Sequence, residues 1–203
     1  MAEAAFPPAL LDALERDAMH VEDVRKALEE LRRRCEQEDI PFAVVGALAM
    51  RQHGYARFTE DIDLVTTPEG LNRLHERLVG RGLAPRGPGL RKKLRDTQYR
   101  VPIDILVAGE HAGSPESPVV YPAPDAPEFV EAADGIRYAR LESLLTFKLA
   151  SGIWGNRPRD LADVQELIKL NRLDESYADQ LPESLRDRFR ELVAASRLER
   201  DIE

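Results

Sequence analysis

The aspartates at positions 61, 63 and 104 are the residues whose type and surroundings point to chemistry. Asp61 and Asp63 lie one residue apart in the stretch DIDLVTT, and Asp104 lies in VPIDILV, so all three carboxylates occur within apolar runs. A charge that is buried without a partner costs several kcal/mol, so these carboxylates require a compensating group. A divalent metal ion is the compensation that this pattern favours.

The spacing of these aspartates also predicts their geometry. Alternate residues of a strand project from the same face, which would bring Asp61 and Asp63 into one small volume. Like charges at that separation raise each other's pKa unless a cation holds them ionised, and hard carboxylate oxygens on a rigid strand suit Mg²⁺ that also carries substrate phosphates. If the strand of Asp104 is a neighbour, the three carboxylates form the kind of site that two-metal phosphoryl or nucleotidyl transfer requires.

Gly46 is a second candidate for phosphate chemistry. It closes the apolar run PFAVVG and opens the segment ALAMRQHG. A glycine between a strand and a helix lets a phosphate approach backbone N–H groups closely. Taken alone, however, the same glycine is more simply interpreted as the end of a strand.

Other metal and phosphate motifs do not fit the sequence. An EF-hand that began at Asp61 would need an oxygen ligand, a glycine and a glutamate where the chain has Val65, Thr66 and Asn72. The stretch RGPGLRKK lacks the G-x-x-x-x-G-K-[ST] pattern, and HERLV at His75 lacks the second histidine of a zinc-protease H-E-x-x-H. These alternatives are excluded.

Hydrophobic periodicity predicts the elements that must position the candidate residues. Apolar residues that recur every three or four positions, from Val21 to Cys35, predict a helix over residues 21 to 38. Strands are expected at residues 41 to 46, 61 to 67, 92 to 100, 101 to 109 and 135 to 140, and helices at 47 to 54, 68 to 82, 141 to 152, 159 to 171 and 182 to 197. Residues 109 to 127 contain five prolines and predict a long irregular connection or a lid.

The composition is that of an ordinary globular protein. The chain has 203 residues, of which 43% are hydrophobic and 33% charged, enough for one sizeable core or a catalytic unit with a helical extension. The single Cys35 excludes an internal disulfide framework and a cysteine-rich zinc site, and it fits a reducing compartment. No basic and apolar leader and no apolar run of about 18 residues is present, so a cytoplasmic location is expected, without a membrane partner.

A basic stretch, which we call the cationic segment, stands out in this acidic protein of net charge −8. Within residues 77 to 100, Asp96 alone opposes eight basic residues, namely Arg77, Arg81, Arg86, Arg91, Lys92, Lys93, Arg95 and Arg100. A charge run is usually a solvated helix end or hairpin. Beside a phosphate-transfer site, the same residues could attract a polyanionic acceptor such as tRNA, through Arg91, Lys92, Lys93 and Arg95.

The motifs together resemble a known superfamily. Gly46-Ala47, thirteen further residues, Asp61-Ile62-Asp63-Leu64 and a later strand with Asp104 are similar to the hG[GS] and Dh[DE]h motifs of nucleotidyltransferases with the DNA polymerase beta-like fold. The stretch LLTFKLASGIWGNRPRDLADVQEL resembles the K and R-D-x-x-D segment of the branch that contains AbiEii-type toxins and uncharacterised relatives. The likeness covers about residues 40 to 172.

The resemblance implies a fold and an activity. The fold is α/β (α+β), with a small mixed β-sheet nucleotidyltransferase core covered by helices, an N-terminal helix and a C-terminal helical extension. We divide the chain into an N-terminal helical segment, residues 1 to 40, the core, 41 to 140, and a C-terminal helical region, 141 to 203. The implied activity is Mg²⁺-dependent transfer of a nucleoside monophosphate from an NTP to a hydroxyl, with two ions, and a toxin of this branch would have an antitoxin as its partner.

The resemblance also assigns roles to residues. Asp61 and Asp63 match the metal-binding pair, and Asp104 matches the third carboxylate, which helps to bind metal and activates the attacking hydroxyl. Gly46 matches the glycine that contacts phosphate. Ala47 departs from the usual Gly or Ser, so it can offer a backbone N–H but no hydroxyl. Arg57 and Thr59 resemble an Arg-x-[ST] that would line the nucleotide.

Three residues of the C-terminal third have competing interpretations. Lys148 lies on the apolar face of its predicted helix, where its amine either binds an anion such as the nucleotide or reaches water at the end of a packed stem. Asp160 is a candidate nucleotide-binding residue, but with Asp163 three positions later it also forms a pattern typical of a helix cap. We favour the structural role for both aspartates.

Two other functions remain open at this point. Ala47 is compatible with a protein that binds nucleotide, metal or a partner protein without turnover. The same carboxylates could instead direct water in a metal-dependent phosphohydrolase.

Overall fold

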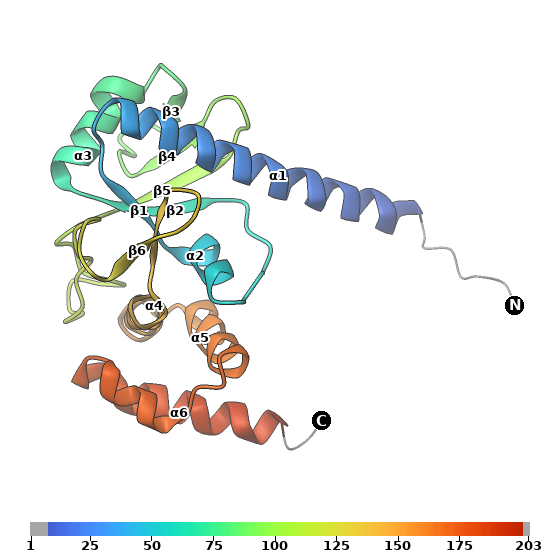
Figure 1. Ribbon diagram of the computed structural model, residues 1–203, viewed down its shortest axis with the longest axis vertical. Coiled ribbons are helices and arrows are strands. Elements are labelled where there is room, and N and C mark those ends of the chain that lie inside the picture. The colour runs from blue at the N-terminus through green and yellow to red at the C-terminus, as the bar shows by residue number, and fades with distance from the viewer. Residues whose placement is uncertain (1–7, 201–203) are drawn as a thin grey trace, which may run out of the picture.

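The computed structural model describes the backbone of residues 8–200 and the side chains of residues 19–197. Within this range helices and strands alternate at first, five consecutive strands follow, and the C-terminal region is helical (Figure 1). In chain order they are α1 (Pro8–Gln37), β1 (Phe42–Val44), α2 (Gly46–Gln52), β2 (Ile62–Thr66), α3 (Pro68–Arg73), the π-helical η1 (Leu74–Leu78), β3 (Leu83–Pro85), β4 (Lys93–Asp96), β5 (Pro102–Val107), β6 (Phe129–Glu131), β7 (Arg137–Ala139), α4 (Leu141–Trp154), α5 (Pro158–Leu170), the 3-10 helix η2 (Glu175–Gln180) and α6 (Glu183–Arg200).

One mixed sheet of seven strands, in the order β3-β4-β5-β2-β1-β7-β6, forms the centre of the fold. β2 pairs with β5 in parallel and with β1 antiparallel, which places the two aspartate-bearing strands side by side. β4 pairs antiparallel with the other side of β5. The predicted α/β class, with a mixed sheet and helices at both ends, is confirmed.

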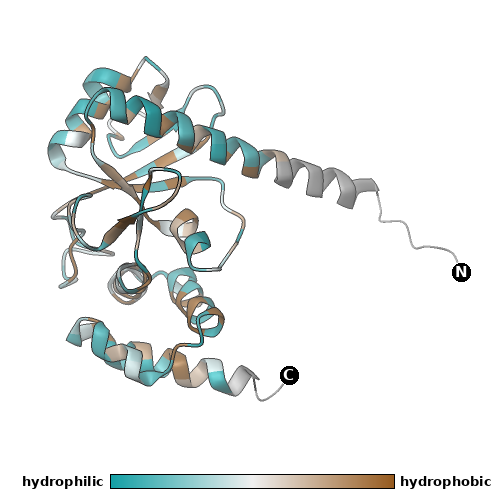
Figure 2. Ribbon diagram, viewed as in Figure 1, coloured by the Kyte–Doolittle hydropathy of each residue, from teal (hydrophilic) through white to brown (hydrophobic). Residues whose placement is uncertain are grey.

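Helices bury the sheet and extend the molecule beyond it. In Figure 1, α1 runs across the β3 and β4 end of the sheet and projects away from it, while α4, α5 and α6 stack below the sheet. α2 packs between β2 and α4, and α5 packs on both α4 and α6. Figure 2 shows the apolar residues gathered in the strands and the inward faces of the lower helices, with polar residues outside.

The apolar stripe of α1 forms as its spacing predicts. Val24, Leu28, Leu31 and Cys35 are buried, whereas Arg25 and Arg33 of the same helix are exposed. The helix begins at Pro8, well before the predicted start at residue 21, and residues 1 to 7 lie outside the described part of the chain. The N-terminal part of this helix forms the projection seen in Figure 1.

The segment after β2 differs from its prediction. A single helix was expected over residues 68 to 82, but α3 ends at Arg73 and continues as the π-helical turn η1, which ends at Leu78. The start follows the expected chemistry, because the Thr67 hydroxyl accepts a hydrogen bond from the Gly70 N–H at 2.9 Å and Pro68 occupies the first turn. Gly80 and Gly82, both with positive φ, carry the chain into β3.

Residues 109 to 127 form an irregular connection that packs against the body of the protein and is not an open lid. Ala112, Val119 and Tyr121 of this connection are buried. Gly113 has a φ of +87°, and a Cβ placed there would lie 2.9 Å from the backbone of Ala150 on α4. The close approach therefore fixes the connection against the C-terminal half of α4.

Candidate active site

Asp61, Asp63 and Asp104 converge at the start of β2 and on β5. Asp63 and Asp104 are direct partners in the parallel register of the two strands, and Asp61 lies immediately before β2. One carboxylate oxygen from each residue lies within 4.8 Å of the others, which is compatible with a shared metal ion. The structure thus brings together the three acids that the sequence singled out.

The absence of a side chain at Gly46 makes room for the carboxylate of Asp63. Gly46 has a φ of +63°, and an ideal Cβ on it would lie 2.0 Å from Asp63 Oδ2. The Val45 N–H donates to the Asp63 carbonyl at 3.0 Å, so the strand end and the aspartate are also joined through the backbone. Gly46 is therefore required for the packing of the site, and its contact with phosphate stays a prediction.

The electrostatics of Asp63 disfavour its ionised form. Burial, followed by the neighbouring Asp61 and Asp104 carboxylates, raises the pKa of Asp63 to about 6, against smaller lowering effects of Lys148 and Arg157. A divalent cation among the three carboxylates would stabilise the ionised form of Asp63 and so lower its pKa. The donor set, three carboxylate oxygens, is that of a hard cation such as Mg²⁺.

Thr59 orients Asp61. Its hydroxyl donates to Asp61 Oδ1 at 2.7 Å, and the residue is only 4% exposed. The sequence suggested that Thr59 lines the nucleotide. It does line the same cleft, but its hydroxyl is engaged by a candidate metal ligand.

Asp104 is held by two cations from the neighbouring hairpin. Arg86 Nη1 lies 2.9 Å from Asp104 Oδ1, and Lys93 Nζ contacts Oδ2. Lys93 is the partner of Asp104 in the antiparallel pairing of β4 with β5. The role of Arg86 was missed from the sequence, since no periodicity connects a loop after β3 with β5.

A buried ion network forms the wall of the site on the side of α4 and α5. Lys148 Nζ lies 2.9 Å from Asp160 Oδ1 and 2.6 Å from Asp163 Oδ2. Arg157 pairs with Asp160 at 3.1 Å, and Arg57, from the segment after α2, pairs with Asp163 at 3.1 Å. The network therefore joins the segment before β2 to the C-terminal helices.

The structure corrects two interpretations of these residues. The amine of Lys148 does not reach water, because the residue is 6% exposed and its anions come from the chain itself. Asp160 and Asp163 do not cap α5, which begins at Pro158 with Arg157 as an N-cap that makes no side-chain cap hydrogen bond. Their structural role is an ion pair with Lys148, since burial of that amine requires a counter-charge.

These groups share one cleft of about 740 Å³. It is lined by Gly46, the three aspartates, Arg57, Thr59, Lys148 and Asp160, and also by Lys92, Lys93, Glu110, Tyr121 and Phe147. Ala47 does not line it and is 2% exposed. Polar and apolar walls in one cleft suit a ligand with phosphate and ring components.

Several cations of the cationic segment have partners within the protein. Lys92 contacts Glu110, Lys93 contacts Asp104, and Arg91 donates to Asn72 at 2.7 Å. Arg95 is exposed on β4, on the same face as Lys93. Fewer of these side chains are therefore available to a ligand than the sequence alone indicates, and contact of the segment with RNA stays a prediction.

No helix in the part of the chain that the structure describes has an apolar stretch of the length needed to cross a bilayer.

A family model matches most of the chain. The family model "Nucleotidyl transferase AbiEii toxin, Type IV TA system" matches residues 29–202. No curated protein sequence gives a significant match.

Solved structures with a similar fold have low sequence identity to this chain. The solution structure of the antibiotic-resistance factor ANT(2'')-Ia has 18% identity and a TM-score of 0.52, over 92% of this chain and 100% of that one. A crystal structure of ANT(2'')-Ia with adenylyl-2''-tobramycin has 16% identity and a TM-score of 0.47, over 87% and 98%. A protein from H. pylori described as a nucleotidyltransferase has 18% identity and a TM-score of 0.47, over 82% and 75%.

Proposed function

The chain belongs to the AbiEii nucleotidyltransferase family, and we propose that it transfers a nucleoside monophosphate from an NTP to a hydroxyl acceptor in a Mg²⁺-dependent reaction. The observation that carries the proposal is the convergence of Asp61, Asp63 and Asp104 in one cleft. Neither a covalent nucleophile nor a buried histidine is needed for this chemistry, since positioning and charge neutralisation supply most of it.

The residues present fit a divalent metal. Asp61 and Asp63 would bind it together with Asp104, and the missing side chain of Gly46 leaves Asp63 the space to do so. When bound, such ions neutralise the charge of the phosphates and of the leaving pyrophosphate. The raised pKa of Asp63 supports the fit, because a bound cation would stabilise the ionised carboxylate that burial and its two acidic neighbours disfavour.

The chain's own residues would bind and orient the substrates. Asp104, which contacts Arg86 and Lys93, would accept the proton of the attacking hydroxyl. Gly46 lies beside Asp63 in the cleft and would contact the triphosphate through its backbone. Arg57, with Lys148 and Asp160 behind it, would face the nucleotide.

The acceptor and the partner are the open parts of this proposal. An RNA acceptor such as tRNA would use Arg91, Lys92, Lys93 and Arg95, and Arg95 is exposed on the same face of β4 as the cleft residue Lys93. A toxin of a Type IV system would be countered by an antitoxin protein. We propose the cytoplasm as the compartment in which NTP, Mg²⁺ and such acceptors are available.

The experiment follows a labelled nucleoside monophosphate from the NTP to its acceptor. The protein is incubated with each α-labelled NTP, Mg²⁺ and a host lysate, and label is sought in RNA, protein and small molecules. Transfer that is lost in Asp61→Asn, Asp63→Asn and Asp104→Asn, but kept in the exposed Asp125→Asn, is the expected result.

Other outcomes would identify the rival functions. Release of inorganic phosphate and nucleotide without a labelled acceptor would indicate a phosphohydrolase. If NTP binds at equilibrium but no acceptor fraction leads to release of pyrophosphate, the result would indicate a binding protein. The site around Ala47 would then hold the nucleotide without catalysing its transfer.

A further inference from the structure

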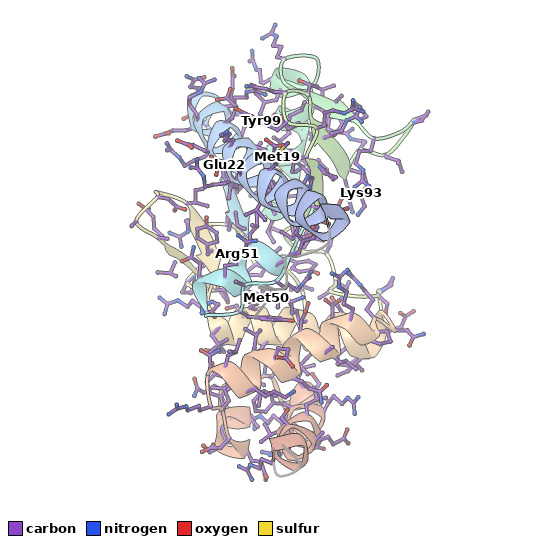
Figure 3. The ribbon with its side chains drawn as sticks, turned by 90° about the vertical axis from the view of Figure 1, so that its right-hand side faces the viewer. Met19, Glu22, Met50, Arg51, Lys93 and Tyr99 are labelled. Atoms are coloured by element: carbon purple, nitrogen blue, oxygen red, sulfur yellow. The ribbon has the colours of Figure 1, made fainter. Side chains whose placement is uncertain are left out.

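Both carboxylate oxygens of Asp104 are occupied by cationic side chains of the protein. Arg86 Nη1 lies 2.9 Å from Oδ1, and Lys93 Nζ contacts Oδ2. The lysine contact is dictated by the backbone, because Lys93 and Asp104 are direct partners in the antiparallel pairing of β4 with β5. Directly paired residues of adjacent strands project to the same face, so the amine cannot avoid this carboxylate without a change of rotamer. Figure 3 labels Lys93 in the sheet-containing part of the molecule.

The contacts of Asp104 coincide with the candidate metal position. An oxygen of Asp104 lies within 4.8 Å of oxygens of Asp61 and Asp63, so a cation bound by all three acids would lie close to the Lys93 amine or the Arg86 guanidinium. Positive charges at such distances repel each other strongly, even when water screens them in part. Metal and side chain therefore compete for the same carboxylate.

We infer that Lys93, assisted by Arg86, is an internal counter-ion that competes with the divalent cation for Asp104 and so sets the metal affinity of the site. The inference rests on the proposed metal site and specifies how that site is regulated. Lys93 releases Asp104 when metal binds, and its amine is then available to face the cleft that it already lines. Its side chain is 48% exposed, so neither the release nor a substitution disturbs the core.

The adjacent Lys92 provides a matched control. It has the same charge, a similar exposure of 45%, a place in the same cleft and an ion pair of its own, but its partner is Glu110 and not Asp104. Removal of either charge changes the net charge of the protein equally. Only the removal of Lys93 frees a candidate metal ligand.

The experiment measures Mn²⁺ binding to the full chain by electron paramagnetic resonance, without nucleotide or turnover. We expect Lys93→Met to bind Mn²⁺ roughly tenfold more tightly than the wild type, and Lys92→Met to stay within about twofold of it. Lys93→Arg, which keeps the charge, should resemble the wild type. Equal or weaker binding by Lys93→Met, while the wild type binds Mn²⁺ through Asp63, would overturn the inference.

If the three aspartates do not form a metal site, Mn²⁺ binding gives a different result. If the wild type and Asp63→Asn bind Mn²⁺ equally, or neither binds it, the site proposed for catalysis is wrong and the inference falls with it. A second measurement uses the wild type alone. Acylation of Lys93 by an amine-reactive ester, followed by mass spectrometry, should accelerate at saturating Mg²⁺ relative to that of Lys92. An unchanged ratio of the two rates would contradict the release of Lys93.

Discussion

Gly46 and Asp63 are so close that the site depends on the missing side chain of the glycine. A Cβ at Gly46 would lie 2.0 Å from Asp63 Oδ2, closer than any real contact allows, and the glycine has a φ of +63°. Replacement by alanine must therefore displace the carboxylate of Asp63, which faces the other two acids. The glycine of the motif is thus needed for the space that it leaves to the Asp63 carboxylate.

Gly46→Ala should consequently damage metal binding more than stability. The positive φ alone costs roughly 1 to 2 kcal/mol for an alanine, and the displaced carboxylate adds a loss of Mn²⁺ affinity. Gly89→Ala is the matched control, because Gly89 has a φ of +73° with no atom within 4 Å of its Cβ position. Urea unfolding and Mn²⁺ titration of both variants provide the measurement. The packing role would be contradicted if the two variants bound Mn²⁺ equally well.

The raised pKa of Asp63 predicts a pH dependence of stability in the metal-free protein. Burial and the neighbouring Asp61 and Asp104 raise this pKa from 3.8 to about 6, so the folded state binds the proton more tightly than the unfolded chain does. The contribution of Asp63 is most favourable below pH 4 and is lost as the pH rises from about 4 to about 6. Above that range it costs the metal-free fold on the order of 2 to 3 kcal/mol.

Asp63→Asn should therefore stabilise the metal-free protein at pH 7 and leave it unchanged near pH 3. Added Mg²⁺ should raise the unfolding temperature of the wild type but not that of the variant, because the ion compensates the same charge. Thermal unfolding in EDTA and in Mg²⁺ measures both effects, with the exposed Asp125→Asn as a control. A destabilised Asp63→Asn in EDTA at pH 7 would refute this account of Asp63.

Much of this site could be predicted because its signals are local. Asp61, Asp63 and Asp104 are charges within apolar strands, and a period of two residues is enough to assign their faces. The helices at residues 21 to 38 and 182 to 197 were found because their apolar positions repeat several times. The strands β3 and β6 were missed, whereas the equally short β1 and β7 were found because they lie within the runs PFAVVG and GIRYAR.

The partners of these residues could not be predicted, because they are joined only by the tertiary fold. Arg57 and Asp163 are 106 positions apart, and Arg86 reaches Asp104 from a loop. Lys148 illustrates the limit well. Its apolar surroundings indicated that its amine needs an anion, but whether that anion is a ligand or an aspartate of the same chain depends on how α5 packs on α4.

Thr59 provides a test of how precisely Asp61 must be placed. Thr59→Val keeps the shape of the side chain but removes the hydroxyl that donates to Asp61 Oδ1 at 2.7 Å. A hydrogen bond from a hydroxyl to a carboxylate contributes about 1 to 2 kcal/mol, so the Mn²⁺ affinity should fall by roughly five- to thirtyfold. Thr59→Ser retains the hydroxyl and should retain most of the affinity. If valine and serine have the same effect, the hydroxyl has no positioning role.

Lys148 should be more important for stability than any exposed lysine of the chain. Lys148→Met would leave Asp160 and Asp163 buried with only Arg157 and Arg57 as counter-charges, and removal of one partner from a buried ion network costs about 3 kcal/mol. The control is Lys26→Met, which breaks an exposed pair with Glu22 at 3.6 Å and should cost less than about 1 kcal/mol. Urea unfolding at pH 7 compares the two variants directly. Adding Asp163→Asn to Lys148→Met should recover part of the loss, because it removes one of the two carboxylates that lost the lysine as a counter-charge. A double variant that is less stable than Lys148→Met would show that Asp163 acts chiefly through Arg57, and the network would then serve to hold the segment before β2 against α5.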